Sequence, residues 1–338
     1  MPPRSYYKEP RVSDYIAFAD AYFPEERNLA AEFAERTRLP YVESSKHLAA
    51  YVGVSPSLLR QIMHKPSYHY REFPLHKADG SERKISTPKT YLKVVQWWVL
   101  DNILARQALD ECVHGFRSGR SYVTNARVHQ NSRHILNVDI KSFFDSIKMS
   151  QVANVFLSLG YSEAGSLTLT ALTTKDGVAP TGAPTSPMIA NLIFRDADLA
   201  LAEFAEANGL IYSRYADDLT FSGQHRIPDE AVAKIAEIVN AAGFELNIKK
   251  TKFMGPGDRQ DVTGVVVNSG LNAPREWRNW ARGYLHRVRL NPDKSAEELG
   301  RVRGVYGILR QFDPERTKSL TRAAFETLEA LKQYRTEP

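Results

Sequence analysis

Two adjacent aspartates interrupt a stretch of sequence that is otherwise typical of β-strands. Residues 212–223 read YSRYADDLTFSG, with Asp217 and Asp218 at the centre. The aromatic and β-branched residues on both sides favour strands, and the residues between them favour a tight turn. Such a hairpin tip is either an ordinary solvated turn, which tolerates Asp well, or a site where paired carboxylates hold divalent cations. A third carboxylate from elsewhere in the chain would decide for the second alternative.

A third aspartate lies in a segment that is expected to be a buried strand. Residues 134–147 read HILNVDIKSFFDSI, and apolar residues surround Asp139 on both sides. A charge inside a buried strand is unfavourable unless it is paired or bound to a metal. We therefore expect the fold to bring Asp139 beside the tip of the 212–223 hairpin, although 78 positions separate it from Asp217.

Three converging carboxylates suit one kind of chemistry. They cannot all stay ionised without cations, and their hard oxygen atoms select Mg²⁺ or Mn²⁺. Two such ions about 4 Å apart bind the attacking and leaving oxygens of an in-line phosphoryl displacement. The three aspartates therefore favour nucleotidyl transfer, in which a sugar hydroxyl attacks a nucleoside triphosphate.

The remaining sequence predicts a small sheet and many helices. Residues 70–87 have the pattern of a β-hairpin with an Asp-Gly turn, and residues 262–268 that of a short strand. Helical spacing of apolar residues predicts helices within 12–64, 91–105, 150–159, 162–173, 188–208 and 228–242. Strands and helices that alternate in this way build a sheet with helices on one face, which is an α+β arrangement.

Positive charge is concentrated in the last fifth of the chain. Residues 275–338 contain 14 Lys and Arg against 9 Asp and Glu, whereas the other 274 residues contain 31 against 30. The arginines alternate with aromatic residues such as Trp277, Trp280 and Tyr284. Guanidinium groups bind phosphates and aromatic rings stack on bases, so this composition suits a nucleic-acid surface. A solvated helical face is the alternative.

Other features of the composition exclude several classes of protein. The single cysteine, Cys112, excludes an intramolecular disulfide and a multi-cysteine zinc site. No apolar run is long enough to span a bilayer, and the opening MPPRSYYKEP contains no apolar signal core. We therefore expect a cytoplasmic protein without a membrane partner.

Several blocks of the sequence resemble, in order and spacing, the motifs of bacterial reverse transcriptases. VDIKSFFDSI, GAPTSPMIANLIF, RYADDLTFSG and GFELNIKKT are similar to the palm motifs of that family, and ERKISTP and HGFRSGRS are similar to its fingers motifs. NARVH at 125–129 and VTG at 262–264 further resemble signatures of the retron reverse transcriptases. The resemblance covers roughly residues 70–290.

The resemblance implies a right-hand polymerase with an α+β fold. Its parts would be an N-terminal helical region at 1–68, fingers at 69–135 with part of 148–190, a ferredoxin-like palm at 136–268 and a basic helical thumb at 269–338. Because the basic segment coincides with the expected thumb, the resemblance favours RNA binding there, by shape and phosphate contacts.

The same resemblance implies roles for individual residues. The metal ligands would be Asp139, Asp217 and Asp218 with the carbonyl of Ile140, binding two Mg²⁺ ions, for which Mn²⁺ is an alternative. Lys250 would donate a proton to the leaving pyrophosphate, or else is a solvated lysine. Nucleotide binding would involve Arg83, Lys84, Arg117, Phe144, Gly182 and Ala183. RNA binding would involve Asn125, His129, Val262, Thr263, Gly264, Arg275, Arg278, Arg282 and Arg287.

Several of these assignments have structural alternatives. Phe144 would be a gate against the 2′-OH of the incoming nucleotide, or would pack beside Phe143. The fingers cations are equally compatible with surface charges. His129 is either structural or a retron-specific RNA contact, and no partner ligand at suitable spacing supports a metal-binding role. Thr181 stands where the family commonly has glutamine, which leaves the contacts of that amide in doubt.

For function, the resemblance implies an RNA-directed DNA polymerase that uses a structured noncoding RNA as template and primer. Synthesis would start from the 2′-OH of a guanosine, consume dNTPs and produce a branched RNA–DNA hybrid, msDNA. A role in antiphage defence and a separate effector protein are also implied. The alternatives are a group II intron-like or other bacterial reverse transcriptase, and a catalytically inactive RNA-binding relative.

Overall fold

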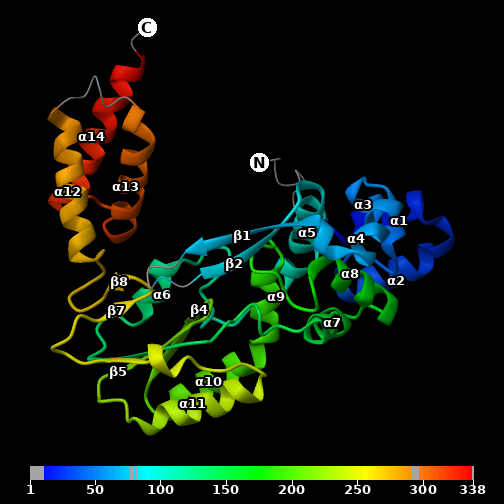
Figure 1. Cartoon of the computed structure of the whole chain (residues 1–338), viewed down its shortest axis with the longest axis horizontal. Helices are drawn as coiled ribbons and strands as arrows, with labels where there is room; N and C mark the ends of the chain where they lie inside the picture. The colour runs from blue at the N-terminus through cyan, green and yellow to red at the C-terminus, as the bar shows by residue number, and fades with distance from the viewer. Residues whose placement is uncertain (1–10, 77–79, 81, 291–296, 337–338) are drawn as a thin grey trace. The chain divides into compact units, whose positions relative to one another are not determined.

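The computed structural model describes residues 11–76, 80, 82–290 and 297–336 (Figure 1). The chain divides into two compact units. The first contains Met1–Phe116, Ile140–Leu201 and Val232–Asn247, and the second contains Arg117–Asp139, Ala202–Ala231 and Ile248–Pro338. The division into a helical region, fingers, palm and thumb stays a prediction.

A four-stranded antiparallel sheet organises the second unit. Its strands are β3 (His134–Asp139), β4 (Ile211–Tyr215), β5 (Asp218–Gly223) and β6 (Lys252–Met254), in the order β4-β5-β3-β6. The predicted hairpin is confirmed as β4 and β5, and the buried strand as β3. In the register of β3 against β5, Asp139 pairs with Asp218.

The two faces of this sheet have opposite character, because side chains alternate along a strand. One face is apolar and includes Leu136, Val138 and Phe221, and Phe221 contacts Phe204 of helix α10 (Arg195–Ala207). The other face carries polar residues of β4 and β5 and is covered by α6 (Tyr122–Val128). The expectation of helices on one face only was wrong, because α6 packs on the polar face.

The predicted strand at 262–268 is a small hairpin. Its strands are β7 (Asp261–Val262) and β8 (Val265–Val266), joined by Thr263 and Gly264. Both connecting residues have positive φ, 48° and 79°, as a two-residue turn that matches the twist of a hairpin requires. Glycine adopts this backbone without steric cost, whereas threonine does not. The apolar residues of the hairpin pack with Val123, Ala126 and Ile135.

The first unit is mostly helical, with one hairpin. The hairpin consists of β1 (Tyr70–His76) and β2 (Glu82–Pro88); apart from Gly80, its predicted Asp-Gly turn lies outside the described residues. Its helices include α1 (Val12–Tyr22), α2 (Arg27–Thr37), α3 (Ser45–Val52), α4 (Pro56–His64), α5 (Thr90–Asn102), α7 (Met149–Ser158), α8 (Glu163–Thr173) and α9 (Ser186–Ile193).

The helix expected at 188–208 is instead two helices. Helix α9 ends at Ile193, and α10 begins at Arg195. Phe194 between them has φ −85° and ψ 1°, which does not continue an α-helix, and its ring is fully buried. Helix α11 (Glu230–Ala241) follows the sheet hairpin and confirms the helix expected at 228–242.

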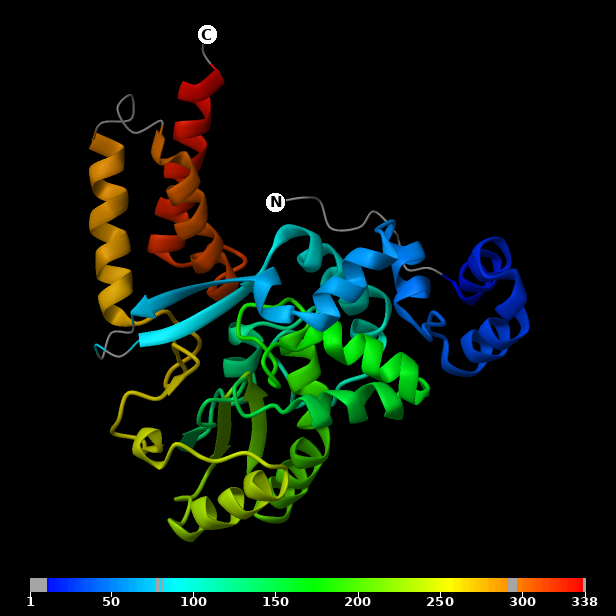
Figure 2. The same ribbon diagram turned by 45° about the vertical axis from the view of Figure 1, so that its right-hand side comes forward.

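Three helices form a bundle at the end of the second unit (Figure 2). This C-terminal bundle consists of α12 (Arg275–Leu290), α13 (Leu299–Phe312) and α14 (Ser319–Thr336). Its core contains Leu285, Val302 and Leu328, so the basic tail is folded around its own hydrophobic centre. Within the described part of the chain, no helix has the length and apolarity needed to cross a membrane.

Candidate active site

The tip of the β4–β5 hairpin is a two-residue turn that is held from inside the protein. Tyr215 and Asp218 pair across it, leaving Ala216 and Asp217 as the connection. Ala216 has φ 58°, a left-handed backbone that costs an L-residue about 1 kcal/mol. The fully buried Arg214 donates from Nη1 to the carbonyl oxygen of Ala216 at 3.1 Å. This contact stabilises a turn that directs two consecutive aspartates to the end of the sheet.

The register of the sheet brings the third aspartate to the same end. Asp139 is the last residue of β3 and lies opposite Asp218, the first residue of β5. Paired residues in antiparallel strands have Cβ atoms about 5 Å apart and side chains on the same face. Asp139 is 8% exposed, whereas Asp217 is half-buried and Asp218 is exposed. The pairing of β3 with β5 therefore brings Asp139 next to Asp218, as the sequence analysis expects.

The electrostatics of this acidic cluster are unfavourable to three ionised carboxylates. Partial loss of water around Asp218 and repulsion from Asp217 and Asp139 raise its pKa from 3.8 to about 6. Because Asp218 is partly exposed, the loss of water raises its pKa less than full burial would. Repulsion from the neighbouring carboxylates raises the same pKa further. The site therefore has an excess of negative charge that a cation would relieve.

One cation of the protein already contacts the acidic cluster. The ammonium of Lys250, in the short 3₁₀ turn Ile248–Lys250, donates to both carboxylate oxygens of Asp139 at 2.9 Å. This hydrogen-bonded ion pair raises the pKa of Lys250, so the ammonium stays charged at neutral pH. The Lys250 side chain is itself largely exposed and long enough to adopt other positions. The predicted catalytic lysine thus lies beside the predicted metal ligands.

The acidic cluster has the donor chemistry of a site for hard divalent cations. Asp139, Asp217 and Asp218 supply only carboxylate oxygens, the ligands that Mg²⁺ and Mn²⁺ prefer. In the described residues, no three His, Cys, Asp or Glu side chains are already gathered around one centre, and the Asp139 carboxylate faces Lys250. Metal binding would therefore require Asp139 to exchange its ammonium partner for a metal ion.

A buried polar network lies on the same face of the sheet, farther from the turn. Both ring nitrogens of His129 contact serine hydroxyls at 2.7 Å, Nδ1 that of Ser222 and Nε2 that of Ser213. Ser213 donates to Asn125 Oδ1 at 2.7 Å, and Ser132 donates to Ser222 at 2.9 Å. All five residues are buried. We call them the serine–histidine network.

Hydrogen bonds extend the network on both sides of the imidazole. Ser213 donates to Asn125 Oδ1 and contacts Nε2 of His129. Ser222 accepts from Ser132 and contacts Nδ1 of the same ring. The network connects α6 to both strands of the hairpin that carries the aspartates.

The two signature motifs meet at this network. Asn125 Nδ2 lies 3.5 Å from the hydroxyl oxygen of Thr263, and that hydroxyl donates to the carbonyl oxygen of Tyr122 at 3.2 Å. The NARVH segment and the VTG turn thus contact one another near the β4–β5 hairpin. The side chains of Asn125, His129 and Val262 are fully buried, which favours the structural alternative for His129. RNA contacts by these residues stay predictions.

The other predicted RNA-binding residues are accessible. Gly264, at the tip of the small hairpin, is exposed, and Thr263 is half-buried. On α12, Arg275, Arg282 and Arg287 are exposed, and Arg278 is half-buried.

The predicted nucleotide-binding cations of the first unit lie on β2. Lys84 forms an ion pair with Glu72 of β1 at 2.6 Å, and Glu72 also pairs with the buried Lys175. Hydrogen bonds from Lys175 and Lys84 lower the pKa of Glu72 to about 2. Arg83 is half-buried next to Lys84. The hairpin therefore presents an exposed ammonium that a carboxylate fixes in place.

The loop that carries Gly182 and Ala183 contacts the same strand. The amide of Gly182 donates to the carbonyl oxygen of Ser86 at 3.1 Å. A Cβ atom at this glycine would lie 2.7 Å from that oxygen, so the close approach requires glycine. Ala183 is buried and Thr181 is half-buried.

Phe144 and Arg117 belong to different units. Phe144 is 9% exposed and contacts both Phe143 and Phe116, with ring centroids 5.6 and 6.2 Å apart. Its packing alternative is therefore present, and its gate role stays a prediction. Arg117 is half-buried at the start of the second unit.

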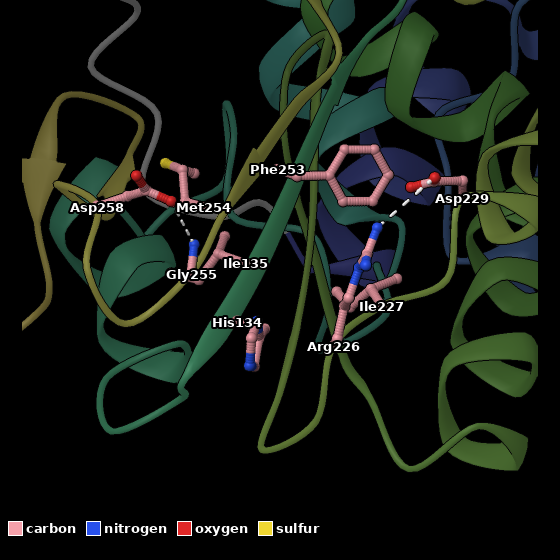
Figure 3. A pocket seen from close by; sticks show the side chains of 9 residues that line it. All are labelled: His134, Ile135, Arg226, Ile227, Asp229, Phe253, Met254, Gly255 and Asp258. Carbon is pink, nitrogen blue, oxygen red and sulfur yellow. Dashed lines mark hydrogen bonds and ion pairs between the residues drawn. The ribbon is translucent and has the colours of Figure 1, made fainter.

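A pocket of about 340 Å³ lies at the other end of β3 (Figure 3). It is lined by His134, at the opposite end of the strand from Asp139, and by Phe253 of β6. The two ends are five residue steps apart along the strand, roughly 17 Å. The charged groups around the pocket are paired, Arg226 with Asp229 and Asp258 with the amide of Gly255. This pocket is separate from the acidic cluster.

Several residues that shape the site were missed by the sequence analysis. Ser213 and Ser222 hold His129, Arg214 holds the turn, and Glu72 with Lys175 holds Lys84. One signal was available in the sequence. Polar residues recur at every second position of β5, which marks a polar face, but that pattern does not identify the partner of each residue.

Comparisons with known proteins agree with the geometry of the site. Residues 75–295 match the family "Reverse transcriptase (RNA-dependent DNA polymerase)". The chain is 33% identical over 328 residues to the retron Mx162 reverse transcriptase of Myxococcus xanthus, which covers 85% of this chain and 68% of that protein. It is 32% identical over 290 residues to the retron Ec86 reverse transcriptase of Escherichia coli, which covers 83% of this chain and 88% of that protein. The chain belongs to the retron reverse transcriptases.

Membership of the retron reverse transcriptases establishes the coarse features of the molecule. The protein is in a family of RNA-directed DNA polymerases with an α+β right-hand fold, and the family implies catalysis with divalent metal ions. A structure of apo telomerase from Candida tropicalis, truncated from its C-terminal domain, covers 62% of this chain and 56% of that chain, with a TM-score of 0.43 at 10% identity. A score this low supports no conclusion.

Proposed function

We propose that this retron reverse transcriptase is active and converts part of a structured noncoding RNA into msDNA. In this proposal the 2′-OH of a guanosine in that RNA is the first nucleophile and dNTPs are the substrates. The observation that carries the proposal is the strand register that places Asp139 opposite Asp218 at the end of the sheet, next to Asp217. An inactive relative would have no reason to retain three repelling carboxylates at one edge.

The acidic cluster would hold two Mg²⁺ ions, for which Mn²⁺ is an alternative. Asp139, Asp217 and Asp218 are the proposed side-chain ligands, and the carbonyl of Ile140 is a proposed further ligand. When bound, the ions would help to deprotonate the attacking hydroxyl and would offset the charge that develops on the phosphate. The neutral fraction of Asp218 that its raised pKa implies would decrease once a cation is bound.

Lys250 is proposed to donate a proton during the reaction. The hydroxyl oxygen forms a bond to the α-phosphorus, and the bond from that phosphorus to pyrophosphate breaks. An ammonium that lies next to the cluster can give its proton to the leaving pyrophosphate. To do so it must leave Asp139, and its exposed side chain allows this movement.

The nucleotide would be bound by residues of the fingers motifs and of the loop at 181–184, which reads TGAP. Lys84 and Arg83 on β2 and Arg117 are proposed to contact the triphosphate, and Glu72 supports this by fixing Lys84. Gly182 and Ala183 are proposed to border the nucleotide, with Thr181 in place of the usual glutamine. The 2′-OH gate remains the proposed role of Phe144.

The RNA would be held by the C-terminal bundle and by the motifs near the VTG turn. Exposed arginines on α12 support binding to RNA phosphates. The msDNA product, a separate effector protein, a role in antiphage defence and a cytoplasmic location complete the proposal.

A direct experiment tests the function. Purified protein is incubated with the noncoding RNA encoded beside its gene, Mg²⁺ and labelled dNTPs. The expected product is DNA that remains attached to RNA through an RNase-resistant 2′,5′-branch, and the D217N/D218N variant should make none. DNA without a branch would point to another priming mode, and no DNA in the presence of tight RNA binding would identify an inactive relative.

A further inference from the structure

The chain makes a tight turn at residues 175–178, shortly after helix α8. Lys175 and Val178 exchange backbone hydrogen bonds of 2.9 and 3.1 Å. Between them, Asp176 and Gly177 both have positive φ, 50° and 82°, as the central residues of a type I′ turn do. The amide of Met149 donates to the carbonyl oxygen of Gly177 at 2.8 Å, so this turn is attached to the start of α7.

The side chain of Lys175 connects the 175–178 turn to the β1–β2 hairpin. Lys175 is 8% exposed, and its ammonium donates to Glu72 Oε1 at 2.5 Å and to Asp176 Oδ2 at 2.7 Å. A buried ammonium is unfavourable unless carboxylates neutralise it, so both ion pairs hold Lys175 in this position. Asp176 also accepts the hydroxyl of Ser67, in the short 3₁₀ turn Pro66–His69 just before β1. The turn is therefore attached both to β1 and to the segment before it.

Glu72 of β1 uses both of its carboxylate oxygens in these contacts. Oε1 accepts from Lys175 and, at 3.2 Å, from the hydroxyl of Ser86. Oε2 accepts from the ammonium of Lys84 at 2.6 Å. Glu72 and Ser86 lie directly opposite each other in the register of β1 against β2. This carboxylate therefore connects the buried Lys175 to both strands of the hairpin and to a proposed nucleotide-binding lysine.

The segment that begins with Lys175 contacts the same cross-strand pair a second time. The amide of Gly182 donates to the carbonyl oxygen of Ser86 at 3.1 Å. Residues 175–182 thus hold the pair of Glu72 and Ser86 by a side chain at one end and by the main chain at the other. A substitution at Lys175 removes only the first contact. The hairpin would then be attached to this segment at a single point, about which it could rotate.

Such a rotation would move both proposed nucleotide-binding cations of β2. Side chains alternate along a strand, so Lys84 shares a face of the hairpin with Glu72, whereas the adjacent Arg83 lies on the opposite face. Lys175 binds the hairpin on the face of Glu72. Because both cations belong to one short strand, the position of that strand determines where each of them meets a triphosphate.

We propose that Lys175 and Glu72 are positioning residues for the incoming nucleotide. Their ion pair sets the hairpin that carries Arg83 and Lys84 against the loop that carries Gly182. The inference rests on the proposed function, which assigns nucleotide binding to these three residues. Lys175 and Glu72 act through the hairpin, so their loss should weaken nucleotide binding more than it slows the chemical step.

The test measures single-nucleotide incorporation by the full chain with the noncoding RNA encoded beside its gene. K175M removes the ammonium and keeps a side chain of similar length, and E72Q removes the charge of its partner and keeps the shape. We expect each variant to raise KM for the dNTP about tenfold and to change kcat less than about twofold. RNA affinity, measured by anisotropy, should stay at the parental value.

Two further variants show whether the ion pair itself is responsible. E82Q is the matched control, because Glu82 lies on the same face of the hairpin and pairs with His76 at 3.1 Å, farther from Lys175 along the strands. Its KM should change less than about twofold. The double variant E72Q/K175M should have nearly the same KM as either single variant, because residues that act through one contact do not have additive effects.

Several results would overturn the proposal. A lower KM in E72Q would show that Glu72 competes with the triphosphate for Lys84. Additive increases in E72Q/K175M, an equal increase in E82Q, or a loss of kcat at unchanged KM would show that the ion pair does not position the nucleotide. Urea unfolding of every variant accompanies the kinetics. If K175M is destabilised, E72Q at its exposed position decides the outcome.

Failure of this inference is distinguishable from failure of the proposed function. If K175M and E72Q keep the parental KM and still make branched DNA, the positioning proposal alone is wrong. If D217N/D218N still makes DNA, the proposed active site is wrong, whatever the KM of the other variants. Should the parent bind RNA and make no DNA, the dissociation constant of a labelled dNTP from the RNA complex still compares K175M with E82Q.

Discussion

Two polar clusters share one face of the four-stranded sheet. They differ in how far hydrogen bonds and opposite charges compensate their polar groups. In the serine–histidine network, the ring nitrogens of His129 and the serine hydroxyls around them all have hydrogen-bond partners. In the acidic cluster, Asp217 and Asp218 repel each other, and Asp139 accepts hydrogen bonds from Lys250. The two clusters lie about four residues apart along β5, roughly 13 Å.

The difference between the clusters separates scaffold from active site. A buried polar network that satisfies itself stabilises one arrangement of the chain. A cluster with excess charge is stabilised only when something else binds, so it marks the place where a ligand is required. The network therefore supports the hairpin, and the turn presents the carboxylates that we propose to hold cations.

The strongest test of the comparison removes the charges of the turn. D217N/D218N should reduce DNA synthesis by on the order of 10³-fold or more, because it removes the proposed metal ligands. Its free energy of unfolding, measured in EDTA, should be unchanged or higher, because carboxylate repulsion is lost. Primer extension and urea unfolding give the two quantities. A variant that keeps more than a tenth of the activity would contradict the assignment.

A substitution in the serine–histidine network should instead lower the stability of the protein. H129A leaves the hydroxyls of Ser213 and Ser222 without their buried partner and creates a cavity, so we expect a loss of about 2–4 kcal/mol in the free energy of unfolding. R127A, an exposed position on the same helix, is the control and should cost less than about 0.5 kcal/mol. If H129A is as stable as R127A but loses RNA binding, the network is part of the RNA site.

A smaller effect is expected for Lys250, the cation that contacts Asp139 in the acidic cluster. K250M should lower the rate of DNA synthesis by about 10²-fold, the size of a general-acid contribution. The Mg²⁺ concentration for half-maximal activity should fall as well, because the ammonium no longer competes for Asp139. Single-nucleotide incorporation at several Mg²⁺ concentrations separates the effects. An unchanged rate would make Lys250 a surface lysine, and K249M is a neighbouring control.

The smallest expected effect is on the pH dependence of stability in EDTA. Asp218 has its pKa raised from 3.8 to about 6, so between those pH values the folded protein keeps a proton that the unfolded chain releases. The contribution of Asp218 to stability therefore decreases as pH rises through this interval. D218N should remove that decrease, whereas D145N, at an exposed position of the first unit, should not. A parental profile in D218N would show that the carboxylates do not interact.

Much of the site was predictable because it depends on local patterns. The strand preference of residues 212–223 and the apolar surroundings of Asp139 predicted β3, β4, β5 and the turn between β4 and β5. Where the local sequence pattern predicted the wrong element, contacts with other parts of the chain determined the structure. Residues 188–208 have one continuous amphipathic pattern, yet the chain bends at the buried Phe194. Residues 262–268 look like one strand, yet Thr263 and Gly264 adopt a turn that contacts Asn125 and Tyr122.

The sequence alone determined which residues we propose to carry the chemistry, because carboxylates, turn residues and motif order are properties of short segments. Tertiary structure alone decided the register that sets Asp139 against Asp218, the lysine that Asp139 binds and the two serines that fix His129. These contacts join segments that are about 80 to 110 positions apart, and they depend on how whole elements pack. No periodicity within one segment specifies its partner, and only the folded sheet makes that choice.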